Sequence, residues 1–256
     1  MSAAKLLTYG NPKIEKGNGF GYSTAILHLA PSDVAGTGFN VCPHASPQCI
    51  ALCLNTAGRG GIFRKGESTN AIQTARIRKT RAFFSDRKAF IASLVREIGA
   101  HVKRAERNGL KPAVRLNGTS DLAWESFAGE IFATFPNVVF YDYSKSARRM
   151  RAYLAGEFPS NYSLTFSRSE TNEAETADIL ARGGNVAFVF STKRGESLPP
   201  SVVRFPSGVN IGIPFAVIDG DVSDLRFTDP RGVVVGLRAK GRARKSEFRG
   251  GFVVNV

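Results

Sequence analysis

The sequence predicts an α/β fold on parallel strands, and three observations support this prediction. Four apolar runs recur at a spacing of 24 residues, marked by Leu116, Phe140, Leu164 and Phe188. Helical candidates separate the runs, as expected for parallel strands joined by right-handed crossovers. Polar residues follow three of the runs directly, at the carboxyl ends where parallel α/β folds carry their sites. We therefore expect a (β/α) barrel, complete or incomplete, with a doubly wound parallel sheet as the alternative.

The first part of the chain predicts one strand and two helices. The strand is expected over Ser23–Leu29, after a turn at the glycine-rich stretch 17–21. The segment Thr69–Asn108 predicts the two helices. In the second helix an apolar residue recurs every four positions, at Phe90, Leu94, Ile98 and Val102. This stripe indicates a helix face packed on the sheet.

The middle and end of the chain continue the alternation. Buried strands are expected at 113–116, 138–141, 162–166 and 185–190, because continuous apolar segments suit strands covered on both faces. Helices are expected at Ala123–Phe135, Ser146–Phe158 and Asn172–Arg182, with Gly183–Gly184 as a C-cap. The stretch 191–208 holds three prolines and two glycines and predicts a loop, and strands follow at 209–218 and 232–237. No hinge divides the chain, so residues 1–256 are expected to form one domain.

All three cysteines, Cys42, Cys49 and Cys53, lie in the stretch CPHASPQCIALC. The start of the chain has no apolar signal segment and no run is long enough to span a membrane, which predicts a reducing compartment with few disulfides. Cys49 and Cys53 stand four positions apart, so one helical turn would place both sulfurs on one face. We expect this cysteine loop, residues 40–61, to present three thiolates to one bound group.

Three converging thiolates suit an iron–sulfur cluster. A [3Fe-4S] cluster needs three, and a [4Fe-4S] cluster held by three leaves one iron open. The alternative is zinc, whose structural sites take four protein ligands, the fourth being His44, or His28 at the end of the first strand. Three buried and unreactive thiols are the remaining alternative.

Five polar residues that follow strands are candidates for a site beside the cysteine loop: Asn117, Asp121, Tyr143, Ser169 and Glu170. The loop also follows a strand, so these side chains are expected to share one cavity with it. Helix N-caps and ordinary polar loops are the alternative explanation. Trp124 is expected to pack in the wall of the fold and His101 in or on a helix.

The formal charge of +14 is concentrated in two basic segments. Residues 59–107 hold 13 Lys and Arg against four acids, and residues 226–249 hold eight against two. This distribution predicts a surface that binds the phosphates of DNA or RNA and does not recognise the base sequence. The residues expected to bind are Arg76, Arg78, Lys79, Arg81, Arg238, Lys240, Arg242, Arg244 and Lys245. A solvated surface with no partner is the alternative.

Six stretches carry a family resemblance: CPHASPQCIALCLNTAGRG, VRLNGTSDLAWE, VVFYDYSK, YSLTFSRSE, NVAFVF and DGDVSDLRFTDPRGVVVGLRAKG. As a set, from about Asn40 to Val254, they resemble the phage protein family known as gene product 88. The resemblance implies a phage-encoded protein that is not secreted and stays in the cytoplasm of a bacterial host.

A looser similarity is to radical S-adenosylmethionine enzymes, which place three cysteines in the loop after the first strand of an α/β barrel. The spacing here is C-x6-C-x3-C rather than their usual C-x3-C-x2-C, and no clear glycine-rich motif follows the second strand. The similarity therefore implies the barrel and the cluster and leaves S-adenosylmethionine binding open.

These observations together predict a phage iron–sulfur protein with a basic surface for nucleic acid. Two alternatives remain at this point. The first is an enzyme that uses a cluster and the polar rim residues on a small substrate. The second is a binding module stapled by zinc.

Overall fold

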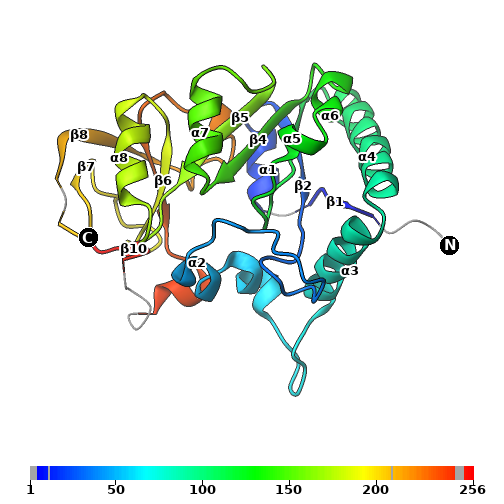
Figure 1. Ribbon diagram of the computed structural model, residues 1–256, viewed down its shortest axis with the longest axis horizontal. Coiled ribbons are helices and arrows are strands. Elements are labelled where there is room, and N and C mark those ends of the chain that lie inside the picture. The colour runs from blue at the N-terminus through cyan, green and yellow to red at the C-terminus, as the bar shows by residue number, and fades with distance from the viewer. Residues whose placement is uncertain (1–4, 11, 209, 246–250) are drawn as a thin grey trace.

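The computed structural model describes residues 5–10, 12–208, 210–245 and 251–256. It has one mostly parallel sheet with the strand order β1-β2-β3-β4-β5-β6-β9-β8-β7, and β10 pairs with β6 beside β5 (Figure 1). The pairs β1–β2 and β7–β8 are antiparallel and the others are parallel. The strands are β1 (Leu7–Thr8), β2 (Tyr22–Leu27), β3 (Lys111–Arg115), β4 (Val139–Ser144), β5 (Tyr162–Ser167), β6 (Val186–Phe190), β7 (Ser201–Arg204), β8 (Asn210–Asp219), β9 (Val234–Arg238) and β10 (Val253–Val254).

The α-helices are α1 (Pro12–Asn18), α2 (Pro47–Ala51), α3 (Ala71–Ser85), α4 (Arg87–Arg107), α5 (Trp124–Phe127), α6 (Glu130–Thr134), α7 (Ala147–Leu154) and α8 (Glu173–Ala181). Four short 3₁₀ helices are η1 (Leu54–Thr56), η2 (Gly58–Gly61), η3 (Arg226–Thr228) and η4 (Gly241–Arg244). The predicted α/β class, the parallel strands and the helices between them are therefore confirmed.

Strands β2 to β6 lie in sequence order, and the helices that follow them pack on one face of the sheet. Leu94 and Ile98 of α4 share a core with Val114 of β3 and Phe140 of β4. A second core joins Met150 of α7 and the side chains of α8 to β5, β6 and β9. Within the described residues, no strand pairing joins β1 to β7 to close a barrel.

The other face of the sheet, here called the inner face, is covered by the chain between β8 and β9. Leu225 packs there against Ala113 of β3 and Tyr141 of β4. The ring of Phe227, in η3, meets Tyr141 edge-on at 5.3 Å. This segment gives the inner face a second, smaller core.

Two predicted elements differ from the structure. The single helix expected at Ala123–Phe135 is two short helices, because Ala128 leaves the helical region at φ −144° and Gly129 is the N-cap from which α6 starts again at Glu130. The loop prediction for 191–208 was wrong at Ser201–Arg204, where Val202 pairs with Phe215 in β8. The strand predicted at 209–218 starts at a residue outside the described part of the chain, and β8 covers its remainder.

Other local predictions hold. The turn expected at 17–21 is closed by a hydrogen bond from Phe20 N to Gly17 O at 2.9 Å. The C-cap of α8 is also present, because Gly183 has φ +78° and Gly184 N donates to Ile179 O at 2.9 Å. A residue with a side chain would be strained at that φ.

Candidate functional site

The cysteine loop lies across the end of the sheet where β2 to β6 finish, and α3 and η4 lie on either side of it (Figure 1). We call this the carboxyl edge and define it as the cysteine loop, α3 and η4. Two contacts hold the loop in place. The carboxylate of Glu170, just after β5, accepts hydrogen bonds from Ser46 Oγ at 2.8 Å and Gln48 N at 3.0 Å. Asp121 N, in the loop after β3, donates to Val41 O at 2.8 Å.

The local structure of the loop sets the position of each thiol. Ser46 caps α2 by accepting a hydrogen bond from Cys49 N at 3.2 Å, and Pro47 occupies the first helical position, where it has no hydrogen bond to lose. The expected turn of helix from Cys49 to Cys53 was wrong, because α2 ends at Ala51. Cys53 instead caps η1, and its sulfur accepts from Asn55 N at 3.5 Å.

All three cysteines are free and half-buried. Burial, with smaller contributions from Cys53 and Cys49, raises the pKa of the Cys42 thiol to about 12, and a backbone hydrogen bond with Ser32 acts against this. Burial also raises the pKa of Cys49, which Lys145 partly opposes. At Cys53 the pKa is raised by burial as well, and a hydrogen bond from Asn55 and the charge of Arg76 act against this. The three groups therefore lie within electrostatic reach of one another and are neutral thiols at pH 7 when nothing is bound.

Among the described residues, no three Cys, His, Asp or Glu side chains lie close enough together to hold one metal ion. The donor chemistry nevertheless fits a group that binds thiolates. All three thiols belong to the cysteine loop, and two cations, Lys145 and Arg76, act on Cys49 and Cys53. Any metal that binds here must displace the thiol protons, so its affinity has to exceed the cost of forming thiolates.

The histidines occupy three different environments. His44 is exposed in the cysteine loop. Burial and the nearby Arg76 lower the pKa of His28 to about 3, so its imidazole is neutral. His101 is buried in α4 with Nε2 3.0 Å from Ser23 O, which agrees with a core histidine.

The structure separates the five rim candidates. Asp121 and Glu170 lie against the cysteine loop, as described above. The Asp121 carboxylate also accepts from Arg149 Nη1 at 2.8 Å and from Lys145 N at 2.9 Å. Asn117 points into the fold, where its Oδ1 accepts from Leu122 N at 2.9 Å.

The other two candidates do not reach the loop through any described contact. Tyr143 lies on the inner face, and its pKa is raised by burial and by Asp224. Ser169 is buried, and its backbone N donates to Asn172 Oδ1 at 2.7 Å at the start of α8. Trp124 is fully buried against Phe83, as expected for a wall residue.

The first basic segment divides between the two sides of α3. Lys79 is buried, with Nζ 2.5 Å from Leu6 O. Arg76 is half-buried and donates from Nη1 to Asn55 Oδ1 at 2.6 Å. Arg78 and Arg81 are exposed. Arg81 donates a hydrogen bond from Nε to Ala35 O at 2.9 Å.

The second basic segment divides in the same way. Arg238 Nη1 lies 2.9 Å from Asp219 Oδ2 and 3.4 Å from Asp221 Oδ2, and Lys240 Nζ lies 2.6 Å from Asp221 Oδ1. Three further side chains on or after η4 are exposed: Arg242, Arg244 and Lys245. The part of the segment at 246–249 lies outside the described residues.

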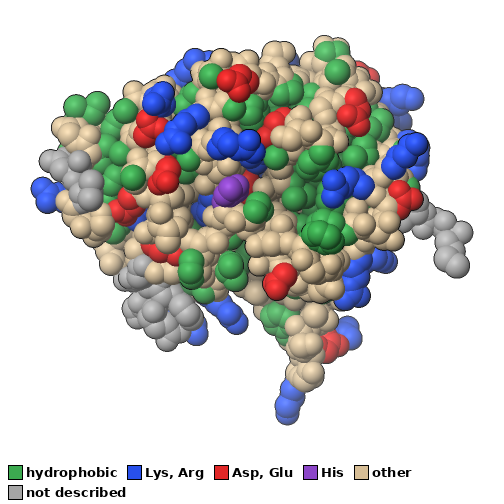
Figure 2. Space-filling model, in the orientation of Figure 1, with side chains coloured by type: hydrophobic (Ala, Val, Ile, Leu, Met, Phe, Trp, Pro, Cys, Tyr) green, Lys and Arg blue, Asp and Glu red, His purple; other side chains and the backbone are tan. Residues whose placement is uncertain are grey.

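The cysteine loop joins the two exposed groups of basic residues. Leu52, in the loop, packs against Ala239, just before η4, and Ala243, within η4. At the other end η2 adjoins α3, and Gln73 Nε2 donates to Gly60 O at 2.9 Å. The exposed arginines of α3 and η4 thus belong to one continuous structure, and Figure 2 shows Lys and Arg side chains along this lower part of the molecule.

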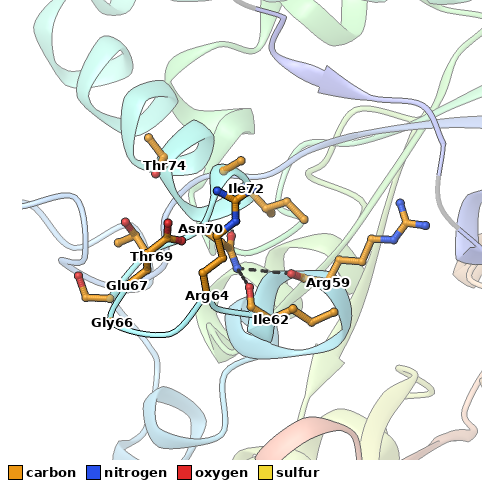
Figure 3. Close-up of a pocket in the computed structure, with 11 residues that line it drawn as sticks. Arg59, Ile62, Arg64, Gly66, Glu67, Thr69, Asn70, Ile72 and Thr74 are labelled. Atoms are coloured by element: carbon orange, nitrogen blue, oxygen red, sulfur yellow. Dashed lines mark hydrogen bonds between the residues drawn. The ribbon is translucent and has the colours of Figure 1, made fainter.

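A hollow of about 830 Å³ opens between η2, the projecting loop after it and the start of α3 (Figure 3). Arg59 and Arg64 line it together with Thr69 and Thr74. Asn70 closes its wall, because Nδ2 donates to Ile62 O at 2.9 Å while Oδ1 caps α3 by accepting from Gln73 N at 3.0 Å. The hollow therefore has two cations and one carboxylate, Glu67, in a lining that also includes apolar side chains, and it lies next to the start of α3.

Lys145 was among the polar residues seen to follow the apolar runs but not among the candidate site residues, and it proves to be a neighbour of Cys49. Its Nζ donates to Ser167 Oγ at 2.7 Å, and its position after β4 was the only available signal. The buried ion pair between Arg115 Nη1 and Asp224 Oδ2, 2.8 Å apart, was also missed. Nothing in the sequence connects two residues so far apart along the chain.

The fold and this edge define an α/β protein with a mostly parallel sheet and a thiol-rich, basic surface at the ends of its strands. A family model described as gene product 88 matches residues 4–250, so the chain belongs to the phage gene product 88 family. No curated protein and no solved structure matches the chain. The similarity to radical S-adenosylmethionine enzymes is not shown by these comparisons. Among the described residues, no helix combines the length and apolar character needed to cross a membrane.

Proposed function

We propose that the carboxyl edge binds nucleic acid through the exposed arginines of α3 and η4. The observation that carries this proposal is the packing of both elements on one cysteine loop. Arg78 and Arg81 on one side, and Arg242 and Arg244 on the other, are exposed and form no ion pair with any described residue. Their positive charge is therefore available to a partner.

The local sequence supports this interpretation, because no acid lies between Glu67 and Asp86 or between Asp229 and Glu247. Each phosphate that such a surface neutralises adds about 0.9 to the slope of log affinity against log salt on duplex DNA. Four arginine contacts would give a slope of roughly 3 to 4. Contacts of this kind position a nucleic acid without specifying its sequence.

The test is fluorescence anisotropy of labelled DNA and RNA at increasing salt. The variant R78E/R81E/R242E/R244E is expected to abolish binding. The control R96E/K103E/R107E/R148E changes the charge equally on exposed residues of α4 and α7 and is expected to bind normally, apart from weaker long-range attraction. Absence of wild-type binding at low salt would refute the proposal.

A second function is favoured by a separate observation, the presence of all three free cysteines in one loop, with Lys145 near Cys49 and Arg76 near Cys53. We propose that Cys42, Cys49 and Cys53 hold an iron–sulfur cluster, whose irons would supply electron transfer or an open coordination position. Each thiolate of a cluster binds a different iron, whereas zinc needs all its ligands around one point, with Zn–S about 2.3 Å. Arg76 and Lys145 would balance the charge of the bound thiolates.

Anaerobic reconstitution followed by iron and sulfide analysis tests this second proposal. C42A, C49A and C53A should each lose the brown colour and most of the bound iron, because the sequence has no spare cysteine. H44A is the matched control within the same loop and should keep both. A colourless protein that purifies with zinc, and that loses the zinc in H44A, would establish the zinc-stapled alternative instead.

The sequential order of β2 to β6, with helices on one face, supports an incomplete barrel as the framework for both functions. Any catalysed reaction would depend on the cluster. Asp121 and Glu170 are the rim residues that would take part, because they contact the cysteine loop. Family membership supports a location in the cytoplasm of the bacterial host, where thiols stay reduced.

A further inference from the structure

We infer that the carboxyl edge takes single-stranded rather than duplex nucleic acid, with the strand lying along α3. This inference rests on the proposed nucleic-acid binding and names its substrate class. Its basis is a pair of exposed phenylalanines near the two ends of α3. Phe39 is 59% exposed and Phe63 is 40% exposed, although neither is needed to fill a core.

Phe39 lies at the carboxyl-terminal end of α3. One face of its ring stacks on Phe84, with the ring centroids 4.8 Å apart and an interplanar angle of 14°. Arg81 reaches the same loop through its hydrogen bond to Ala35 O. An exposed ring, held flat by a second ring and next to an arginine, provides a stacking platform for a base with a cation for its phosphate.

Phe63 lies at the amino-terminal end of the same helix. The preceding residue, Ile62, is fixed to Asn70, the N-cap of α3, by the hydrogen bond shown in Figure 3. The following residue, Arg64, lines the hollow together with Arg59. This end of α3 therefore repeats the combination of an exposed aromatic ring and cationic side chains.

The helix between the two rings is the right length and charge for a short single strand. Its 15 residues span about 22 Å at 1.5 Å each. That corresponds to roughly six nucleotides at about 3.4 Å per phosphate along one strand. Arg78 and Arg81 are exposed on this path, and the helix has no acid. A duplex hides its bases inside the stack, so the exposed rings would add nothing to its binding.

The experiment compares F39A, F63A and the control F20A on a labelled 12-nucleotide single strand and on the matching duplex. Phe20 is 54% exposed on the turn before β2 and is away from the carboxyl edge. F39A and F63A are each expected to weaken single-strand binding by roughly tenfold and to leave duplex binding unchanged. F20A should leave both unchanged.

Two further variants separate stacking from folding. F39Y and F63Y keep an aromatic ring and should restore single-strand binding to within about twofold of wild type. F63W adds an exposed indole to a chain whose one tryptophan, Trp124, is fully buried, and its fluorescence should be quenched by the single strand alone. Equal effects of F39A and F63A on both substrates, or none on either, overturn the inference while leaving nucleic-acid binding intact. If neither variant changed binding to either substrate, the exposed rings would instead form a surface for a protein partner. Absence of wild-type binding to any strand overturns both proposals.

Discussion

The inner face of the sheet and its carboxyl edge both carry arginines, and they use them in opposite ways. On the inner face Arg115 is paired with Asp224, and Arg226 Nε lies 3.3 Å from Asp229 Oδ2. Both arginines are buried. At the carboxyl edge Arg78 and Arg242 are exposed and lack such partners among the described residues. Paired charges hold a segment of this chain in place, whereas unpaired charges are available to another molecule.

The difference is clearest in residues that are neighbours in the sequence. Arg78 and Lys79 have similar charge and follow one another on α3, yet one is exposed and the other is buried. Successive residues of a helix project about 100° apart, so a run of basic residues is always divided between faces. Net charge per segment therefore overstates the surface that a partner would meet.

The largest effect is expected on the inner face, from Arg115→Met. The variant removes the buried cation that lies 2.8 Å from Asp224 Oδ2, and loss of one member of a buried pair costs about 3 to 5 kcal/mol. Urea denaturation measures this directly. The double variant R115M/D224N also removes the carboxylate charge of Asp224, so it should be more stable than R115M. A loss below about 1 kcal/mol for R115M would show that the pair does not hold the 219–231 segment.

The next effect depends on pH and concerns Lys79. Burial lowers the pKa of Lys79 from 10.5 to about 8, with a smaller opposing effect from Glu97. Between these values the unfolded chain binds a proton at Lys79 that the folded chain has released, so stability from this group rises with pH. The free energy of unfolding of wild type minus that of K79M should therefore increase by up to about 3 kcal/mol from pH 8 to 10.5.

Taking this difference between the two proteins removes the titration of other groups. The thiols and buried tyrosines have raised pKa values and act in the opposite direction over the same range. Parallel stability curves for wild type and K79M would mean that Lys79 reaches solvent. K79M should in either case leave nucleic-acid affinity nearly unchanged, in contrast with exposed Arg78.

Sequence alone was sufficient for the strands that are buried on both faces. The runs around Val114, Phe140, Leu164 and Phe188 gave β3 to β6 to within a few residues, because continuous apolar segments have few other uses. Strands β1 and β10 have two residues each and exist only through pairing with β2 and β6. No local pattern encodes such a strand.

The candidate site was predictable to a lesser extent. Three cysteines in one loop, and the polar residues after the strands, were sufficient to place Asp121 and Glu170 beside that loop. The sequence could not show which residues of α3 are buried and which are exposed. The side of the helix that faces inward is polar and includes Gln73, Arg76 and Thr80. Hydrophobic periodicity gives no signal on such a helix, so the buried side could not be distinguished from the exposed one.

A smaller effect should distinguish the two halves of the second basic segment. Arg238 binds Asp219 and Asp221 with a side chain only 14% exposed. R238M is expected to cost about 1 to 2 kcal/mol in thermal or urea unfolding and to leave nucleic-acid affinity within about twofold. R242M should do the reverse, with unchanged stability and weaker binding. If R238M weakened binding as much as R242M, the ion pairs with Asp219 and Asp221 would not decide which arginines are available.

The smallest effect is expected for Arg78→Gln. It tests at a single position whether an exposed arginine without an ion partner serves binding rather than folding. An exposed residue without an ion partner contributes little to folding, so stability should change by less than about 0.5 kcal/mol. Nucleic-acid affinity at moderate salt should fall severalfold, because one phosphate contact is lost. The salt slope should decrease by about 0.9, the value of a single released counterion on a duplex, or about 0.7 on a single strand. R107Q, at the far end of α4, is the matched control and should leave the slope unchanged. A slope for R78Q equal to that of wild type would mean that Arg78 does not touch phosphate. Binding would then have to be assigned to η4 alone.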